Sequence, residues 1–240
     1  MRRSSALAAS SALAMGMVGS GCPGDRTAET GLIPDQGCVV DPGHFVDVSI
    51  EPTLVPTVFD VAWTTAEPAV GHVLFTAGDA LWNTTPDAQA ELQHQALLVG
   101  SPALATVQVR LISQVDEELV CSDTFTRSTP APPPELPVLT VNGDYAMSEP
   151  DGWALAPVGF DKVSIPALVD SQGRYCWWWQ DEGYYFYADL ARGGRSMLLL
   201  DSRYGLEVSG RLLEVGLDGT ILDEREVPGP TTTWSRIPTV

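Results

Sequence analysis

Positive charge is scarce in this chain of 240 residues, which has 13 Lys and Arg residues against 31 Asp and Glu residues. Lys162 is the only lysine, and the formal net charge at pH 7 is −18. A surface this acidic repels phosphate backbones and anionic headgroups. Nucleic acid is therefore excluded as a partner, and a soluble, acidic, exported surface is the simplest interpretation.

Residue types that ligate metals or act as nucleophiles are also few. The three histidines, His44, His72 and His94, are dispersed, and the four cysteines have neither a CxxC pair nor zinc-site spacing. Nucleophile-elbow serine motifs and glycine-rich phosphate loops are absent from the sequence. We therefore expect no metal, no cofactor and no catalytic residue, and we interpret His72 as a structural strand residue.

A long apolar run occurs only at the N-terminus. Arg2 and Arg3 precede an apolar stretch at residues 6–18, which is shorter than the roughly 20 residues of a spanning helix and suits a secretory signal. Residues 1–22 are therefore predicted to be a signal peptide that exports the chain.

The residues "VGSGC" at the end of this signal resemble a bacterial lipobox, with Gly19 where leucine is usual. The resemblance implies that Cys22 carries lipid and anchors the chain to a membrane. An ordinary cleaved signal and an uncleaved anchor are the alternatives. Pro23, rather than Asp, follows Cys22, so we expect attachment to the outer membrane of the cell envelope.

Two of the remaining cysteines suit an oxidising compartment. Cys38 and Cys121 are a candidate disulfide that would staple the N-terminal segment to a late strand. Cys176 lies in an aromatic run and is expected to be a buried thiol.

The pattern along the chain is all-β. Residues 23–43 are predicted to be a flexible tether. Strict alternation of apolar and polar residues then begins, and Val46, Val48 and Ile50 are expected on one face of a strand. The segments "FDVAWTT" and "LATVQVRLIS" resemble strands of a fibronectin type III domain, with Trp63 at the buried position. Residues 44–128 are therefore predicted to form an immunoglobulin or fibronectin type III-like sandwich.

A proline-rich linker follows at residues 129–137. Consecutive prolines at 132–134 favour an extended segment that holds two domains apart. Residues 138–230 then repeat strand, Asp/Gly turn and strand, which suggests a partial β-propeller of about one to two blades. The Asp/Gly pairs are interpreted as hairpin turns rather than calcium loops.

The run "YCWWWQDEGYYFY" has two interpretations. Its aromatic side chains are a candidate ligand surface, chiefly Trp177, Trp178, Trp179 and Tyr185. Alternation along a strand favours packing instead, with one face inside a blade and the other against the next blade. Exposed aromatic strands of this kind are also a candidate surface for homo-oligomers.

The segments "GWALAPVGF", "ALVDSQGRYCWWW", "MLLLDSRYG" and "LLEVGLDGTILDEREVPGP", after a fibronectin-like domain, resemble in order the opening of bacterial arylsulfotransferases. The resemblance implies sulfuryl transfer from phenolic sulfate esters to phenols through a transiently sulfated histidine. No histidine of this chain matches the family's catalytic one, so no catalytic residue is carried over, and we expect the chain to be inactive alone. Phenols and aromatic sulfates are expected as substrates only of a full-length form.

The family's first catalytic motif, His-His-Asp, is expected where this chain has "TTTWSRIPTV". A shift of the reading frame by one base after Pro230 permits that motif. We therefore expect residues 231–240 to be an out-of-frame tail, with a genuine polar ending as the alternative. Two further functions stay open: a non-enzymatic surface module that binds protein or glycan, and an enzyme supplied in two pieces.

Overall fold

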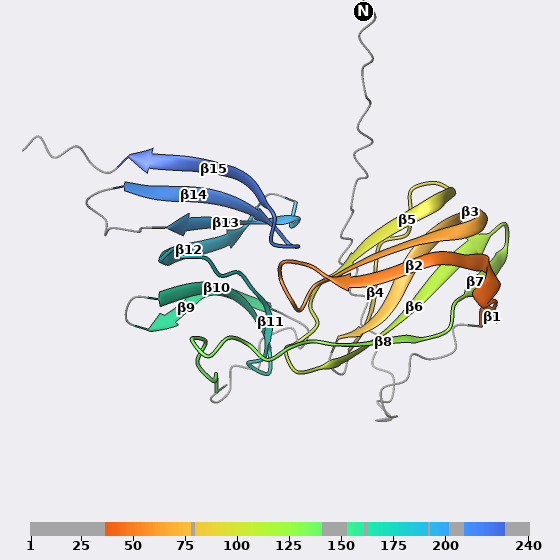
Figure 1. Cartoon of the computed structure of the whole chain (residues 1–240), viewed down its shortest axis with the longest axis horizontal. Coiled ribbons are helices and arrows are strands. Elements are labelled where there is room, and N and C mark those ends of the chain that lie inside the picture. The colour runs from red at the N-terminus through yellow and green to blue at the C-terminus, as the bar shows by residue number, and fades with distance from the viewer. Residues whose placement is uncertain are drawn as a thin grey trace, which may run out of the picture.

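The computed structural model describes residues 37–77, 80–140, 153–160, 163–191, 193–201 and 209–228. Within them the chain is all-β, with a sandwich followed by a partial β-propeller, as the sequence predicted (Figure 1). The predicted signal, Cys22, most of the tether and the tail at 231–240 lie outside the described residues.

The sandwich consists of eight strands and one short 3-10 helix, η1 (Pro42–His44). The strands are β1 (Val39–Val40), β2 (Phe45–Pro52), β3 (Phe59–Ala77), β4 (Ala80–Asn83), β5 (Glu91–Leu98), β6 (Thr106–Val115), β7 (Glu118–Cys121) and β8 (Phe125–Ser128). The long strand β3 belongs to both layers. Its first half pairs with β2 and β5, and its second half pairs with β4 and β6.

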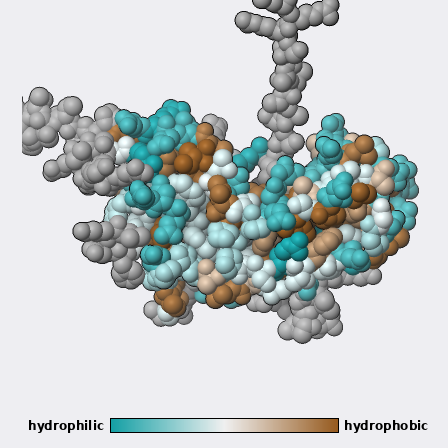
Figure 2. Space-filling model, viewed as in Figure 1, coloured by the Kyte–Doolittle hydropathy of each residue, from teal (hydrophilic) through white to brown (hydrophobic). Residues whose placement is uncertain are grey.

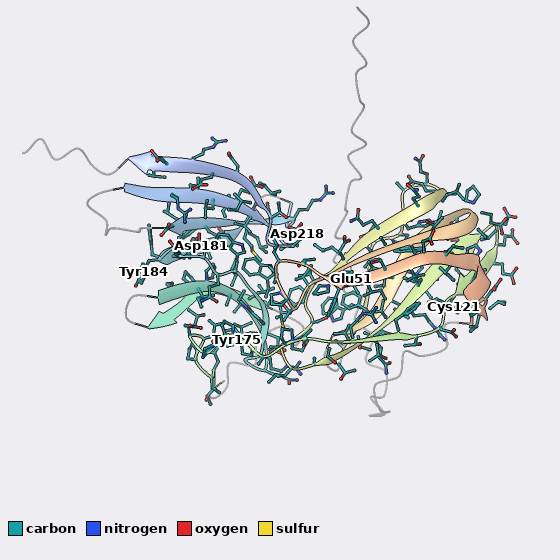
Figure 3. All side chains as sticks on the ribbon, viewed as in Figure 1. Glu51, Cys121, Tyr175, Asp181, Tyr184 and Asp218 are labelled. Atoms are coloured by element: carbon teal, nitrogen blue, oxygen red, sulfur yellow. A yellow bond between two sulfur atoms is a disulfide. The ribbon has the colours of Figure 1, made fainter. Side chains whose placement is uncertain are left out.

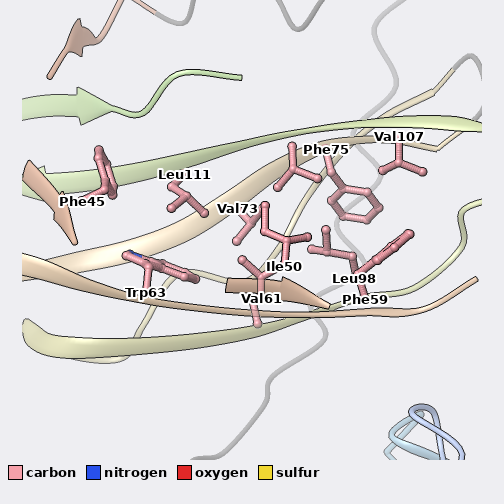
Figure 4. Close-up of a cluster of buried hydrophobic side chains, with 12 residues drawn as sticks. Phe45, Ile50, Phe59, Val61, Trp63, Val73, Phe75, Leu98, Val107 and Leu111 are labelled. Atoms are coloured by element: carbon pink, nitrogen blue, oxygen red, sulfur yellow. The ribbon is translucent and has the colours of Figure 1, made fainter. Parts of the chain in front are cut away.

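The core of the sandwich lies between these two layers (Figure 4). Phe59, Val61 and Trp63 from β3 point into it, and Trp63 is buried, as the fibronectin-like pattern predicted. Val73 and Leu111 face each other across the β3–β6 ladder and belong to the same core. Burying each such side chain contributes about 1.5–3 kcal/mol to folding.

The predicted alternation fails in β2. Phe45 and Ile50 point inward, whereas Val46 is exposed and Val48 is only partly buried. The pairing of β2 with β3 shifts register between Val46 and Ser49, and Asp47 in this stretch has φ 52. The expectation that Val46, Val48 and Ile50 share one face is therefore wrong for Val46, because a bulge inserts an extra residue between Val46 and Ser49, whereas Val48 and Ile50 both pack against the core.

The second unit contains two antiparallel sheets. A three-stranded sheet consists of β9 (Trp153–Phe160), β10 (Val163–Asp170) and β11 (Tyr175–Trp178). A four-stranded sheet follows in chain order, with β12 (Tyr185–Leu190), β13 (Ser196–Asp201), β14 (Ser209–Gly216) and β15 (Ile221–Pro228). Four sequential antiparallel strands are the topology of a propeller blade.

The outer strand of this blade-like sheet is charged. Strand β15 carries Asp223, Glu224, Arg225 and Glu226 along its exposed length. Charges on an edge strand discourage pairing with another chain. The sheet is therefore protected on this side, while Met197, Leu199, Leu213 and Val215 on its inner side are fully buried.

The sandwich and the partial propeller share a hydrophobic core where they meet. Val55 and Val58, from the loop between β2 and β3, pack in one cluster with Trp177 and Leu213. Thr57 Oγ1 donates to the carbonyl oxygen of Cys176 at 2.8 Å. Figure 1 shows this loop reaching from the sandwich toward the blades.

The proline-rich linker does not act as the predicted spacer. Its Leu136 is buried in a cluster with Ile165 and Trp178 of the second unit. Trp82 of the sandwich also stacks on Trp153 of β9, with ring centroids 5.2 Å apart. The expectation of separated domains is wrong, because both units end in apolar surface that is more stable when covered.

Candidate functional sites

His94 is held in the arrangement that most resembles a catalytic one. Its Nδ1 lies 2.6 Å from Asp87 Oδ2, and its Nε2 lies 3.1 Å from Thr65 Oγ1. A hydroxyl, an imidazole and a carboxylate in this order are the parts of a nucleophilic triad. However, His94 and Thr65 are 4% and 2% exposed, so no substrate reaches the hydroxyl.

The same contacts have a structural use. The imidazole stacks on Trp63 at 4.9 Å, and Asp87 Oδ2 also accepts the backbone N–H of Gly71 at 3.0 Å. The group therefore joins β3, β5 and the segment between β4 and β5. Sequence reasoning missed the Asp87–His94 pair, because six residues of irregular and extended chain separate the two and no motif marks them.

The other histidines are also structural. His44 is buried edge-to-face against Phe45, with ring centroids 5.1 Å apart. His72 lies in β3, as predicted, and burial lowers its pKa, with a smaller opposing effect from the negative charge of Asp87. All three histidines of the chain thus belong to the sandwich.

The aromatic run is not an exposed ligand surface. Trp177, Trp178, Trp179 and Tyr185 are all buried, between 0% and 8% exposed. The indole Nε1 of Trp177 donates to Leu217 O at 2.9 Å, and that of Trp179 donates to Gly219 O at 3.1 Å. These four residues pack in the interior. The hypothesis that they form an exposed ligand surface is therefore wrong.

Both faces of β11 are covered, which explains why three consecutive tryptophans are buried. Trp177 and Trp179 pack in the core shared with the sandwich. Trp178 packs in the cluster that contains Leu136 of the linker. A strand covered on both faces loses the alternation between buried and exposed positions.

The exposed aromatics of the run lie further along, in and just before β12. Tyr184, Phe186 and Tyr187 are 41%, 44% and 48% exposed. The pairing of β12 with β13 shifts register between Tyr185 and Tyr187, so neighbouring side chains do not alternate regularly. Figure 3 places Tyr184 and Asp181 in the second unit, away from the sandwich.

A partly buried ionic cluster joins β13, β14 and β15 of the second unit. Arg211 in β14 contacts Asp181 and Asp201 at 2.9 Å and Glu224 at 3.1 Å. Tyr185 OH also donates to Asp181 Oδ1 at 2.6 Å. Sequence reasoning did not find this cluster, since its members come from separate strands and carry no motif.

The ionic contacts move the pKa values of the cluster. Burial alone would raise the pKa of Asp181, but hydrogen bonds from Tyr185, Gly183 and Arg211 outweigh it and lower this pKa. Burial, and then the contact with Asp181, raises the pKa of Tyr185. Carboxylates keep Arg211 charged and raise its pKa despite burial. The cluster therefore acts as a clamp that joins the segment before β12 to β13, β14 and β15.

Three of the four cysteines lie in the described residues, and Cys22 does not. Cys38 and Cys121 are joined by a disulfide that closes a loop with a sequence separation of 83. Figure 3 places Cys121 at the end of the sandwich far from the second unit. Cys176 is free and buried, and burial raises the pKa of its thiol to about 12. A thiol with this pKa is a poor nucleophile at neutral pH.

Features of other kinds of site are absent from the part of the chain that the structure describes. Three or more His, Cys, Asp or Glu residues do not gather there in a way that would hold a metal ion. Nor do the described residues include a helix that is long and apolar enough to cross a membrane. On the face in Figure 2, apolar and hydrophilic residues are interspersed over both units.

Comparisons with known proteins add little. No protein family matches the sequence, and no curated protein is similar to it. Among solved structures, a chain from a study of the host cell surface retention of a 1.5-MDa bacterial ice-binding adhesin is similar over 76% of this chain. This chain spans 63% of that chain, at 12% identity and a TM-score of 0.25, which is too low for an argument about fold or function.

Proposed function

We propose that this chain is an exported, non-catalytic module in which the sandwich braces the first blades of a propeller. The observation that carries this proposal is the shared core, where Val55, Val58 and Val99 of the sandwich pack with Trp177 and Leu213 of the blades. A brace of this kind holds blade-forming sheets in place without taking part in chemistry.

The ionisable groups support a structural role. His94 contacts Asp87 and Thr65 through its two ring nitrogens, and Arg211 forms ion pairs with three carboxylates. The candidate groups for catalysis are therefore buried in contacts that stabilise the fold. Export and a lipid on Cys22 complete the proposal, and the disulfide between Cys38 and Cys121 suits an oxidising compartment.

The larger protein that this module would serve is, on this proposal, similar to an arylsulfotransferase. The sequential order of β12, β13, β14 and β15 supports a propeller architecture. The resemblance of the sequence supplies the activity, which is sulfuryl transfer to phenols. Fold alone does not assign it, because propellers carry many functions.

An assay of sulfuryl transfer tests the non-catalytic role. The purified chain is incubated with 4-nitrophenyl sulfate as donor and 2-naphthol as acceptor, and nitrophenol release is measured. We expect no release above a protein-free control. Turnover that persists after purification and is abolished by His94→Ala or His44→Ala would contradict the proposal.

One observation favours a second function, a surface module that binds other chains. Tyr184, Phe186 and Tyr187 present aromatic surface around β12, and aromatic residues are enriched in protein interfaces. A second copy of the chain is the simplest occupant to test. Light scattering measures the oligomeric state of the wild type and of the double variant Phe186→Ser/Tyr187→Ser. A wild-type oligomer that dissociates in the variant supports this function, and a wild-type monomer excludes self-association.

A further inference from the structure

The four-stranded sheet of β12 to β15 has one buried face and one open face (Figure 1). Residues that pair across neighbouring strands share a face, and the pair of Leu199 and Leu213 is fully buried in the core at the junction. Side chains alternate along each strand, so the next row, which consists of Tyr187, Leu200 and Leu212, lies on the opposite face. Tyr187 is 48% exposed and both leucines are partly exposed, so we call this side the open face.

A bulge gives the open face two consecutive aromatic residues. The register of β12 against β13 shifts between Tyr185 and Tyr187, so Phe186 is an extra residue opposite Leu200. Tyr185 is buried, whereas Phe186 and Tyr187 are both exposed. In a regular strand one of two neighbouring side chains would turn inward. The bulge therefore enlarges the aromatic surface that solvent reaches.

A row of carboxylates runs next to these rings on the open face. Asp189, Glu214 and Asp223 lie in one row across β12, β14 and β15, and Leu198 of β13 lies between the first two. Asp223 pairs with Arg225 at 2.8 Å. Among the described residues, neither Asp189 nor Glu214 has a basic partner. The row therefore keeps a net negative charge.

Asp189 is fixed beside an aromatic ring by neutral donors. The Tyr187 hydroxyl donates to Asp189 Oδ2 at 2.8 Å, and the backbone N–H of Leu190 donates to Oδ1 at 2.8 Å. Neither donor carries a positive charge that would offset the carboxylate. The open face thus presents a negative charge in contact with an exposed ring.

A positively charged partner satisfies both features. A guanidinium stacks on the face of an aromatic ring and also forms charge-assisted hydrogen bonds with a carboxylate. A second copy of the chain, or any anionic partner, would bring more negative charge against a protein whose net charge is −18, and like charge opposes such contacts.

We propose that the open face docks a basic segment of another protein, with arginine side chains on the rings of Phe186 and Tyr187 and a guanidinium on Asp189. This inference rests on the second proposed function, a surface that binds other chains, and it names the chemistry of the partner.

Fluorescence anisotropy of labelled peptides with the full chain tests this proposal. The probe is the peptide Ser-Arg-Ser-Arg-Ser-Arg-Ser, and its control has citrulline, an uncharged analogue of the same shape, in place of each arginine. We expect saturable binding of the arginine peptide and at least about tenfold weaker binding of the citrulline peptide. Absence of saturable binding, or equal binding of the two peptides, would overturn the proposal.

Variants separate the open face from the acidic surface as a whole. Phe186→Leu/Tyr187→Leu keeps the charge and the apolar character but removes both rings, and it should weaken binding of the arginine peptide by about fivefold or more. Asp189→Asn should weaken it by about twofold to fivefold. Glu118→Gln, which removes one exposed charge from β7 in the sandwich, should leave it unchanged.

Two outcomes with these variants would overturn the proposal. Equal losses in Asp189→Asn and Glu118→Gln would show that the peptide follows the charge of the whole surface. Unchanged binding in Phe186→Leu/Tyr187→Leu would show that the rings take no part. The exchanged side chains are exposed, and circular dichroism of each variant verifies that the fold is kept.

This proposal and the two proposed functions fail independently. A wild type that is monomeric in light scattering excludes self-association and leaves peptide binding as it is. Loss of peptide binding leaves the shared core and the result of the sulfuryl-transfer assay unchanged.

Discussion

At the scale of single residues, the chain places charge in two very different settings. Arg211 is surrounded by carboxylates, and the side chain of Asp201 beside it is fully buried. Arg225 instead pairs with Asp223 at 2.8 Å on the surface, where the two side chains are 74% and 47% exposed. Water screens the attraction between the two exposed charges. The buried carboxylate is shielded from water and is stabilised mainly by the protein groups around it.

Replacing Arg211 should therefore be costly. Arg211→Met removes the cation beside the buried carboxylate of Asp201 and should lower the free energy of unfolding by about 3–5 kcal/mol. Arg225→Met, the matched control, should change it by less than about 1 kcal/mol. Urea unfolding measures both variants, and equal losses would show that the cluster is not a clamp.

His72 makes stability depend on pH. Its folded-state pKa lies below the ordinary value of 6.5, so the unfolded chain binds more protons as pH falls through that value. Stability should therefore begin to fall as the pH drops through about 6.5, and His72→Gln should lessen this fall. Thermal unfolding at several pH values measures the effect. An identical pH dependence in the variant would contradict it.

At the scale of elements, the edge strands are protected in different ways. Strand β15 is charged, whereas β9 carries no charged side chain and ends its sheet. Pro157 in β9 lies opposite Pro166 in β10. Neither residue has an N–H, so the pair is a non-hydrogen-bonded one and Pro157 faces the open edge. The missing donor is what protects β9.

Restoring that donor should promote association. Pro157→Thr adds an N–H on the open edge of β9, and pairing of two copies should tighten by about tenfold, given about 1 kcal/mol for each new hydrogen bond. Ala156→Thr is the control, because residue 156 faces β10. Light scattering over a range of concentrations compares the two. A variant Pro157→Thr that associates no more than Ala156→Thr would contradict the argument.

The elements also show what the sequence could and could not predict. The burial of Trp63 was predicted correctly, because apolar residues alternate strictly in this part of β3 and only one face of the strand packs against the core. Val46 was misplaced, because the bulge at Asp47 has no signature stronger than one polar residue. Trp178 was ambiguous, because its burial depends on Leu136 in a linker that sequence reasoning treated as a spacer. The Asp87–His94 pair was not predicted, because the irregular segment before β5 carries no motif that marks it.

At the scale of the whole molecule, the two ends of the sandwich are stabilised by different means. The far end is closed by the disulfide between Cys38 and Cys121, and the near end is buried against the blades. A cross-link over a sequence separation of 83 should stabilise the fold by about 4 kcal/mol, mainly by restricting the unfolded chain.

Reduction should reveal this contribution. The urea midpoint of the wild type should fall when a reductant is added. The double variant Cys38→Ala/Cys121→Ala should unfold at the lower midpoint with or without reductant. A wild type whose midpoint is unchanged under full reduction would contradict the stabilising role of this cross-link.

Calorimetric unfolding of the full chain is the most direct test of the claim that the sandwich braces the blades. The shared core of Val55, Val58, Trp177 and Leu213 couples the two units. We expect one transition whose van't Hoff enthalpy equals its calorimetric enthalpy, as cooperative unfolding requires. Two separate transitions, one of them unchanged by Val58→Asp, would show that the units fold independently and would contradict the account.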